Sequence, residues 1–136
     1  KIAVKDIAYT GTVVSMGNPH FVIPVGSLPE VPLAELGPLL EGGFPGGTNI
    51  ELVRQVCRER IELRVWERGC GETPACGTGA CAAAAVLYAR GALEDWVTVV
   101  MPGGRAEVRF DRLGRVSVTA PAVTVYEGEL AEGWSW

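Results

Sequence analysis

The fold is decided by residues 67–90, which read ERGCGETPACGTGACAAAAVLYAR. Their second part, from Gly77 to Arg90, is rich in alanine and predicts a helix, and Gly91 follows at the position where glycines commonly end helices. This predicted helix has no polar face, and a helix that is apolar all round is buried all round. We therefore expect one central helix with the rest of the chain folded around it.

Strands are predicted on both sides of this helix, where apolar and polar residues alternate. Residues 49–56 and 60–67 are joined by a short link, so we expect them to form an antiparallel hairpin. Further strands are predicted over residues 7–14, 21–25, 96–101, 105–110, 114–120 and 123–127, and a short amphipathic helix over residues 32–40. The sequence thus predicts an α+β fold, in which a curved, mainly antiparallel sheet wraps around the central apolar helix.

The composition limits the class of protein. At 136 residues the chain has the length of one domain, which we assign to residues 1–136. Hydrophobic residues make up 48% of the chain, which argues against disorder, and the net charge of −4 argues against a nucleic-acid surface. The sequence has no apolar run of membrane-spanning length and no signal-peptide pattern. We expect a soluble, cytoplasmic protein with no nucleic-acid or membrane partner.

The cysteines do not have the spacing of a metal site or of a disulfide framework. There are four of them, Cys57, Cys70, Cys76 and Cys81, and no two form a Cys-x-x-Cys pair. The single histidine, His20, is far from all of them in the sequence. We therefore expect no bound metal, and we expect structural roles for the cysteines other than Cys76.

Cys76 lies in a glycine-rich turn just where the central helix is predicted to begin. The free N–H groups at a helix start carry partial positive charge and hold anions. We therefore expect the pKa of Cys76 to be lowered and its thiol to be the most reactive of the four. The same turn can hold a carboxylate beside the sulfur, a combination that suits chemistry at the α-carbon of an amino acid.

Three segments of the chain resemble the C-terminal half of the diaminopimelate epimerases. They are residues 16–20 (MGNPH), 47–51 (GTNIE) and 64–80, and their order and spacing cover the chain from about residue 13 to residue 85. The most specific part is the string Glu-Arg-Gly, Gly-Glu-Thr and Ala-Cys-Gly-Thr-Gly within residues 67–79. The resemblance implies one half of a pseudo-symmetric two-domain fold, whose N-terminal half is missing from these residues.

The resemblance also implies an activity that needs no cofactor. Enzymes of this family interconvert LL- and meso-diaminopimelate, on the pathway to lysine and peptidoglycan. One cysteine, as a thiolate, removes the α-proton, and a second cysteine, as a thiol, delivers a proton to the opposite face. Each cysteine comes from a different half of the protein. The implied partners are therefore the small-molecule substrate and the N-terminal half that carries the second cysteine, with a homodimer as a further expectation.

For the reacting centre, the resemblance assigns three neighbouring residues. Cys76 is the acid/base residue, and Gly77 and Thr78 offer their amides, and Thr78 also its hydroxyl, to the reacting carboxylate. Removing one donor of this kind typically costs about 3 kcal/mol of barrier.

For the rest of the substrate, the resemblance assigns five residues outside the helix start. Asn18, Asn49 and Arg68 hold the distal amino-acid end, and the guanidinium of Arg68 suits fork-like pairing with a carboxylate. Glu67 contacts a substrate ammonium and tunes a cysteine pKa, and His20 tunes the opposing cysteine.

Three other functions remain open on the sequence alone. A proline-racemase-like or phenazine-pathway-type isomerase has the same architecture, but the joint presence of the polar residues for a second amino-acid group favours diaminopimelate. A non-catalytic binding domain of the same fold is disfavoured because Cys76 is retained in its turn. A thiol redox protein is disfavoured because there is no Cys-x-x-Cys arrangement.

Overall fold

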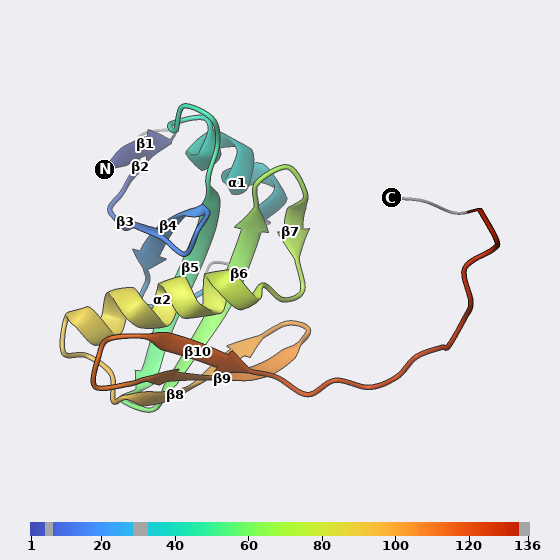
Figure 1. Ribbon diagram of the computed structural model, residues 1–136. Helices are drawn as coiled ribbons and strands as arrows, with labels where there is room; N and C mark the ends of the chain where they lie inside the picture. Colours follow the sequence, from blue (N-terminus) through green and yellow to red (C-terminus); the bar gives the residue numbers. More distant parts are fainter. Residues whose placement is uncertain (5–6, 29–32, 134–136) are drawn as a thin grey trace.

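The computed structural model describes residues 1–4, 7–28 and 33–133, which form two helices and ten strands (Figure 1). The helices are α1 (Leu33–Glu41) and α2 (Gly77–Ala89). The strands are β1 (Ile2–Val4), β2 (Ile7–Tyr9), β3 (Thr12–Ser15), β4 (Pro19–Pro24), β5 (Asn49–Cys57), β6 (Arg60–Glu67), β7 (Gly71–Thr73), β8 (Trp96–Met101), β9 (Gly104–Phe110) and β10 (Val116–Thr119).

One large sheet contains most of the strands, in the order β10-β9-β8-β6-β5-β4-β3, with β7 paired to β6. Neighbouring strands run antiparallel except for two parallel pairs, β4 with β5 and β6 with β8. Parallel neighbours need long crossover connections, and α1 and α2 provide them. The predicted α+β fold, the mainly antiparallel sheet and the β5–β6 hairpin are confirmed.

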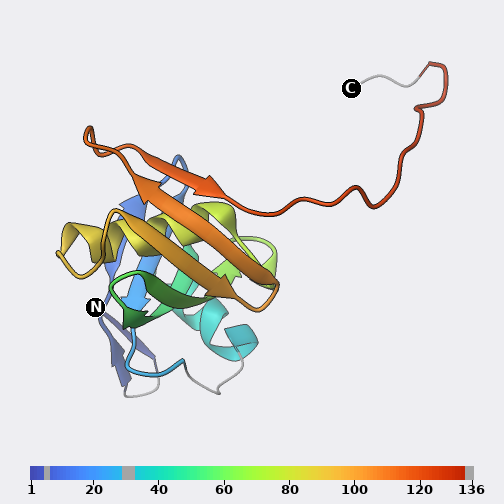
Figure 2. The same ribbon diagram turned by 90° about the horizontal axis from the view of Figure 1, so that it is seen from below.

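The sheet curls around α2, which crosses it from edge to edge (Figures 1 and 2). The helix contacts β3, β4, β5, β6, β8, β9 and β10. Its alanines are short enough for the strands to approach closely, and Ala80, Ala82, Ala83 and Ala84 are fully buried. The predicted central apolar helix is therefore confirmed. It ends as expected, because Arg90 is its C-cap and Gly91 follows with a φ of +70°.

A second hydrophobic cluster lies on the other face of the sheet, under α1. Leu33, Leu36 and Leu40 of the helix pack there against Ile50 and Leu52 of β5. Because side chains alternate along a strand, the intervening residues of β5 face α2 instead, and Val53 belongs to the α2 cluster. Both faces of β5 are therefore covered. This arrangement explains why a polar residue of β5 can be fully buried.

Two strand predictions are wrong. Residues 7–14 do not form one strand, because β2 pairs with β1 in a separate small sheet and β3 joins the large one. Residues 123–127 form no strand: the chain leaves β10 as an extended segment in which Val125 and Tyr126 are 89% and 84% exposed (Figure 2). The strand propensity is present, but β10 is the edge of the sheet and no described strand pairs with this segment.

The predicted helix at residues 32–40 is confirmed as α1 from residue 33 onward, and Pro32 lies outside the described residues. Among the described residues, neither helix has the length and apolar sequence needed to cross a membrane.

Trp66, near the end of β6, fastens α1 to the sheet. Its indole Nε1 donates a hydrogen bond to Oε2 of Glu41 at 2.8 Å. The ring lies directly against the backbone of Gly37, where a Cβ atom would overlap it. The glycine therefore permits this close approach of helix and strand, immediately before Glu67.

We expect Gly37→Ala to destabilise the protein. An alanine within a helix is normally favoured over glycine by about 1 kcal/mol. Here the new methyl group meets the Trp66 ring, and overpacking of this kind typically costs about 1–3 kcal/mol. Urea denaturation should therefore show a net loss of stability. Gly26→Ala is the matched control, because a Cβ at Gly26 meets no atom within 4 Å. Equal unfolding midpoints for the two variants would contradict the expected overlap at Gly37.

Candidate active site

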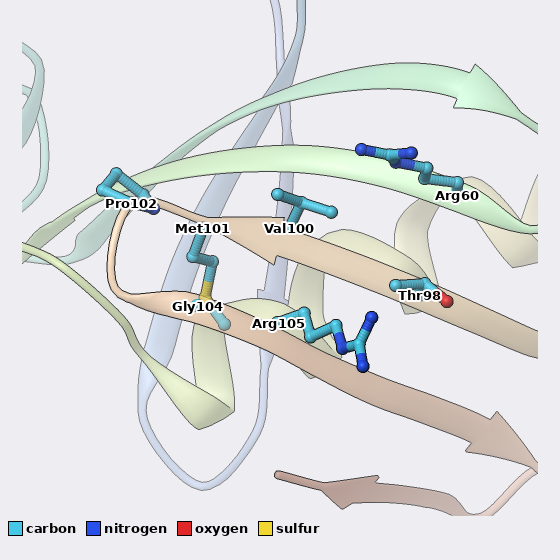
Figure 3. Close-up of a pocket in the computed structure, with 7 residues that line it drawn as sticks. All are labelled: Arg60, Thr98, Val100, Met101, Pro102, Gly104 and Arg105. Carbon is cyan, nitrogen blue, oxygen red and sulfur yellow. The ribbon is translucent and has the colours of Figure 1, made fainter. Parts of the chain in front are cut away.

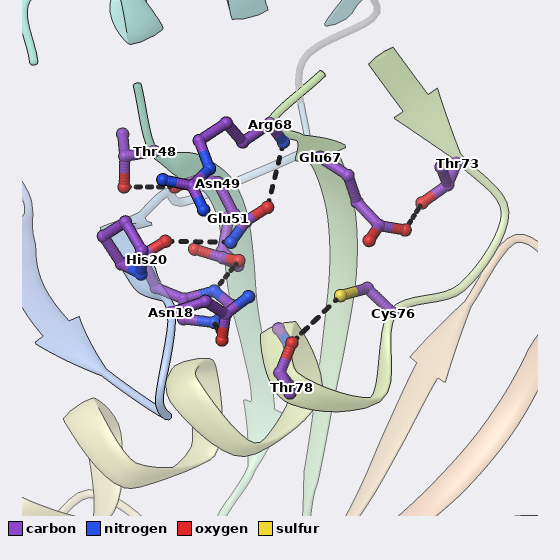
Figure 4. A network of polar contacts seen from close by, with 12 residues as sticks. Asn18, His20, Thr48, Asn49, Glu51, Glu67, Arg68, Thr73, Cys76 and Thr78 are labelled. Atoms are coloured by element: carbon purple, nitrogen blue, oxygen red, sulfur yellow. Dashed lines mark hydrogen bonds and ion pairs between the residues drawn. The ribbon is translucent and has the colours of Figure 1, made fainter. Parts of the chain in front are cut away.

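Cys76 is the N-cap residue of α2, with φ −142° and ψ 116°. Its Sγ accepts a hydrogen bond from the amide of Gly79 at 3.3 Å and lies 3.5 Å from the hydroxyl oxygen of Thr78 (Figure 4). The amides of Gly77 and Thr78 belong to the first helical turn, so they have no partner within the helix. Both residues are exposed. The helix start thus presents a sulfur and two free N–H donors at one place.

Burial raises the pKa of Cys76 above its ordinary value, and the thiol is only 7% exposed. The hydrogen bonds from Thr78 and Gly79 act in the opposite direction, but the negative charge of Glu67 and its hydrogen bond with the thiol raise the pKa further. The predicted lowering of this pKa is therefore wrong. Sequence shows the helix start, whereas the desolvation and the neighbouring carboxylate arise only from packing.

Glu67 is the last residue of β6, and its carboxylate is oriented by Thr73. The Thr73 hydroxyl donates a hydrogen bond to Oε1 of Glu67 at 2.6 Å. The two side chains meet because β7 folds back on β6, pairing Gly71 with Glu67. Sequence reasoning gave no role to Thr73. The signal that could have revealed it is the tight turn at Gly69, which brings the following residues back beside β6.

Asn49 connects three strands at the same end of the sheet. Its Nδ2 donates to the carbonyl of Pro19 at 2.8 Å, and its Oδ1 accepts from the backbone amide of Arg68 at 2.9 Å. One N–H of its amide group remains for a ligand. The Arg68 side chain is exposed, and its Nη1 donates to the carbonyl of Gly46 at 3.3 Å. The structure therefore brings Asn49 and the backbone of Arg68 together.

His20 and Glu51 form a fully buried pair beside the helix start. The parallel register of β4 and β5 places His20 opposite Asn49, so that Glu51 follows two residues further along. Nδ1 of His20 lies 2.6 Å from Oε1 of Glu51, and Nε2 lies 3.0 Å from Oδ1 of Asn18 (Figure 4). Both ring nitrogens are thus occupied within this chain. Sequence reasoning missed Glu51, because a glutamate between Ile50 and Leu52 in an alternating strand normally faces solvent.

The sequence-predicted residues gather where β4 and β5 begin and β6 ends, beside the start of α2 (Figure 4). This site contains Asn18, Asn49, Glu67, Arg68, Cys76, Gly77 and Thr78, with His20 fully buried behind Asn18. All four cysteines lie in the described part of the chain and are free thiols; Cys57 and Cys70 are exposed, and Cys81 is buried. Within the described ranges no cluster of His, Cys, Asp and Glu residues has the geometry to hold a metal ion.

A separate hollow lies on the opposite face of the sheet, between β6, β8 and β9 (Figure 3). It is lined by Arg60, Thr98 and Arg105, among others. Val97 and Val99 face α2, so the alternating side chains of Thr98 and Val100 face away from that helix. This hollow therefore lies on the face of the sheet that points away from α2.

The fold is shared with solved structures of PhzF-family proteins. The chain aligns with a PhzF-family phenazine biosynthesis protein from Enterococcus faecalis at a TM-score of 0.56 and 18% identity, covering 70% of this chain and 35% of that one. A Bacillus anthracis protein of the same PhzF family aligns at a TM-score of 0.54 and 23% identity, covering 81% and 36%. At these identities the likeness concerns the fold alone.

Sequence similarity identifies the family. The family model described as "Diaminopimelate epimerase" matches residues 12–129, and the chain therefore belongs to the diaminopimelate epimerase family. A diaminopimelate epimerase from Parabacteroides distasonis is 50% identical over 123 residues, covering 88% of this chain and 46% of the relative. The one from Bacillus subtilis is 44% identical over 131 residues, covering 93% and 46%. The chain spans about half the length of the curated relatives it matches.

We expect Cys57 and Cys70 to be alkylated before Cys76 in the isolated chain. The sequence alone predicted the reverse order, but Cys57 and Cys70 are exposed whereas Cys76 is buried with a raised pKa. Brief treatment with iodoacetamide at pH 7, followed by mass-spectrometric mapping, measures the order. First labelling at Cys76 would show that the helix start outweighs burial.

We also expect Glu67→Gln to lower the pKa of Cys76. The substitution removes the negative charge that raises this pKa, while burial is unchanged. The alkylation rate of Cys76 should therefore rise at a lower pH than in the wild type. Glu72→Gln is the control, because Glu72 pairs with Arg64 and is not among the groups that shift the Cys76 pKa. Identical pH profiles for the wild type and Glu67→Gln would show that Glu67 does not influence the pKa of Cys76.

Proposed function

We propose that this chain supplies one acid/base cysteine and much of the substrate pocket of a diaminopimelate epimerase. The intact protein would interconvert LL- and meso-diaminopimelate without a cofactor, in lysine and peptidoglycan precursor synthesis. The observation that carries this proposal is the grouping of a thiol, two free helix-start amides and a carboxylate at the start of α2. Membership of the family supports it, since the relatives bear that activity in their names. The phenazine-type alternative is supported by the fold alone.

In the proposed reaction, Cys76 is the proton donor in its resting state. A raised pKa keeps its thiol protonated at neutral pH. A thiolate on the missing half removes the α-proton from one face of the substrate, and the Cys76 thiol gives its proton to the opposite face. The carbon configuration is inverted, the other cysteine becomes a thiol, and Cys76 becomes a thiolate. The reverse reaction exchanges the two roles.

Two sets of donors stabilise the charges that develop in this step. The thiolate formed at Cys76 keeps the hydrogen bond from the Gly79 amide and can receive one from the Thr78 hydroxyl. The amides of Gly77 and Thr78 hold the reacting carboxylate, and the positive end of α2 favours negative charge there. Glu67 lies close enough to Cys76 to exchange a proton with it or to contact the substrate ammonium.

The distal end of the substrate is assigned to Asn18, Asn49 and Arg68. The exposed guanidinium of Arg68 retains donors for a carboxylate, and Asn49 retains one N–H. His20 is fully buried, and its hydrogen bond with Asn18 is its connection to the residues assigned to the distal end of the substrate. We propose that it influences the opposing cysteine by this indirect route.

The proposal includes further expectations about the intact protein. Residues 1–136 act as one domain that docks against an N-terminal half carrying the second cysteine; the described part spans about half of each relative. The cytoplasm is the expected compartment, which agrees with four free thiols. Neither a nucleic acid nor a membrane is an expected partner. A homodimer of the intact protein stays a prediction for analytical ultracentrifugation.

We expect the intact protein to incorporate solvent deuterium at the α-carbon of LL-diaminopimelate. Cys76→Ala should reduce inversion by about 10²–10⁴-fold, because one of the two acid/base groups is lost. The 136-residue chain alone should show negligible inversion, since one thiol reaches only one face. Cys81→Ala is the control for loss of a buried thiol elsewhere on α2. Full inversion by the isolated chain would mean that it contains a second base.

We expect Arg68→Lys to weaken recognition of the distal carboxylate more than chemistry at the reacting centre. A lysine cannot reproduce the planar fork of the guanidinium. The loss in kcat/KM for diaminopimelate should be about 2–4 kcal/mol. An analogue without the distal carboxylate should show a much smaller difference between wild type and variant. Equal losses on the two compounds would place Arg68 at the reacting centre.

A further inference from the structure

The buried carboxylate of Glu51 is the polar group that the proposed mechanism leaves unused. Its side chain is fully buried, and its Oε1 lies 2.6 Å from Nδ1 of His20. Its Oε2 is buried and, among the described residues, has no hydrogen-bond partner. An unsatisfied buried oxygen is costly, and replacing such a pair by apolar residues is often neutral or stabilising. Stability alone therefore does not account for a glutamate here.

The packing around Glu51 leaves space for its carboxylate under the first turn of α2. Gly79 lies directly above it, and a Cβ at Gly79 would be 3.1 Å from Oε1. Gly79 is also the residue whose amide donates to the sulfur of Cys76. The carboxylate thus lies between the His20 ring and the helix start. Its hydrogen bond with His20, and that of His20 with Asn18, connect it to the candidate site (Figure 4).

The hydrogen bonds of this chain fix where the protons are. Oδ1 of Asn18 has no hydrogen, so Nε2 of His20 must carry one and donate it. The short contact between Nδ1 and Glu51 holds one further proton, either on the ring or on the carboxyl. In both cases the pair is neutral overall and Nε2 is protonated. Burial raises the pKa of the Glu51 carboxyl, which His20 opposes and the charge of Glu67 reinforces.

We propose that Glu51 is a positioning residue that fixes the His20 ring and, through it, the orientation of the Asn18 amide. With Nε2–H donating, the carbonyl of Asn18 turns inward and its Nδ2 group turns outward. Among the described residues this Nδ2 group has no protein partner, and Asn18 is half-buried. Asn18 is therefore held as a donor, which selects a carboxylate over an ammonium at that point. This effect on substrate rests on the proposed function, whereas the effect on the ring does not.

Nuclear magnetic resonance of the imidazole nitrogens tests the effect on the ring without any substrate. The signals in the intact protein are assigned by their loss in a His20→Gln variant. We expect a protonated Nε2 at neutral pH and a proton on the Glu51 side that resonates far downfield of an ordinary imidazole N–H. In Glu51→Gln that downfield proton should lose its shift, and Nε2 should move towards the average of two tautomers. An unprotonated Nε2 in the wild type would overturn the proposal.

Kinetics of the intact protein then test the connection to Asn18. Glu51→Gln and Asn18→Ala should each raise KM for diaminopimelate by about tenfold, the loss expected for one donor to a charged group, with kcat changed much less. The double variant should be no worse than Asn18→Ala alone, because the two residues act as one unit. Additive effects would overturn the proposal. Glu62→Gln is the control, since Glu62 pairs with Arg54 away from the site.

The resonance and kinetic experiments distinguish failure of the positioning role of Glu51 from failure of the proposed function. A protein without epimerase activity but with a protonated Nε2 would reject the proposed function and retain the positioning role. An active protein in which Nε2 carries no proton would do the reverse.

Discussion

The burial of α2 is the constraint on which the rest of the structure depends. An apolar helix of mostly alanine side chains has no surface that favours water, so strands from both edges of the sheet pack against it. Ala82 and Ala83 are fully buried, and larger residues there would push the sheet away. Because the helix body cannot shift, its first turn is held in one place. Cys76 and the two free amides inherit that rigidity, as preorganised donors require.

The strands bring the remaining polar groups to that turn by register alone. The parallel pairing of β4 and β5 sets His20 beside Asn49, and the antiparallel pairing of β5 and β6 sets Ile50 opposite Trp66. Glu67 and Arg68 therefore follow directly after Trp66, the last residue of β6 that pairs with β5. Burial raises the pKa of the Glu51 carboxyl and of the Cys76 thiol, and the negative charge of Glu67 adds to both shifts.

Features that depend on local sequence were predictable. The hairpin around residues 57–59, the helix ended by Gly91 and the position of Cys76 at its start all follow from short-range patterns. Glu51 was not predictable in the same way. In an alternating strand a glutamate between two apolar residues normally faces solvent, but β5 is covered by α1 on one face and α2 on the other. The prediction of a lowered pKa for Cys76 was wrong for the same reason, because the direction of the pKa shift is decided by residues that meet only after folding.

The segment at residues 123–127 shows that strand propensity is conditional. Val123 and Val125 alternate as in a half-buried strand, yet both are almost fully exposed. A strand exists only where another strand accepts its hydrogen bonds, and the described sheet ends at β10.

The reacting thiol likewise depends on a partner. A thiol held at one helix start addresses one face of a carbon atom, however well its pKa and donors are arranged, and inversion needs a second group on the opposite face. In the proposed reaction the raised pKa of Cys76 is therefore useful only beside a partner that begins as a thiolate, so this half of the site defines the protonation state that the other half must have.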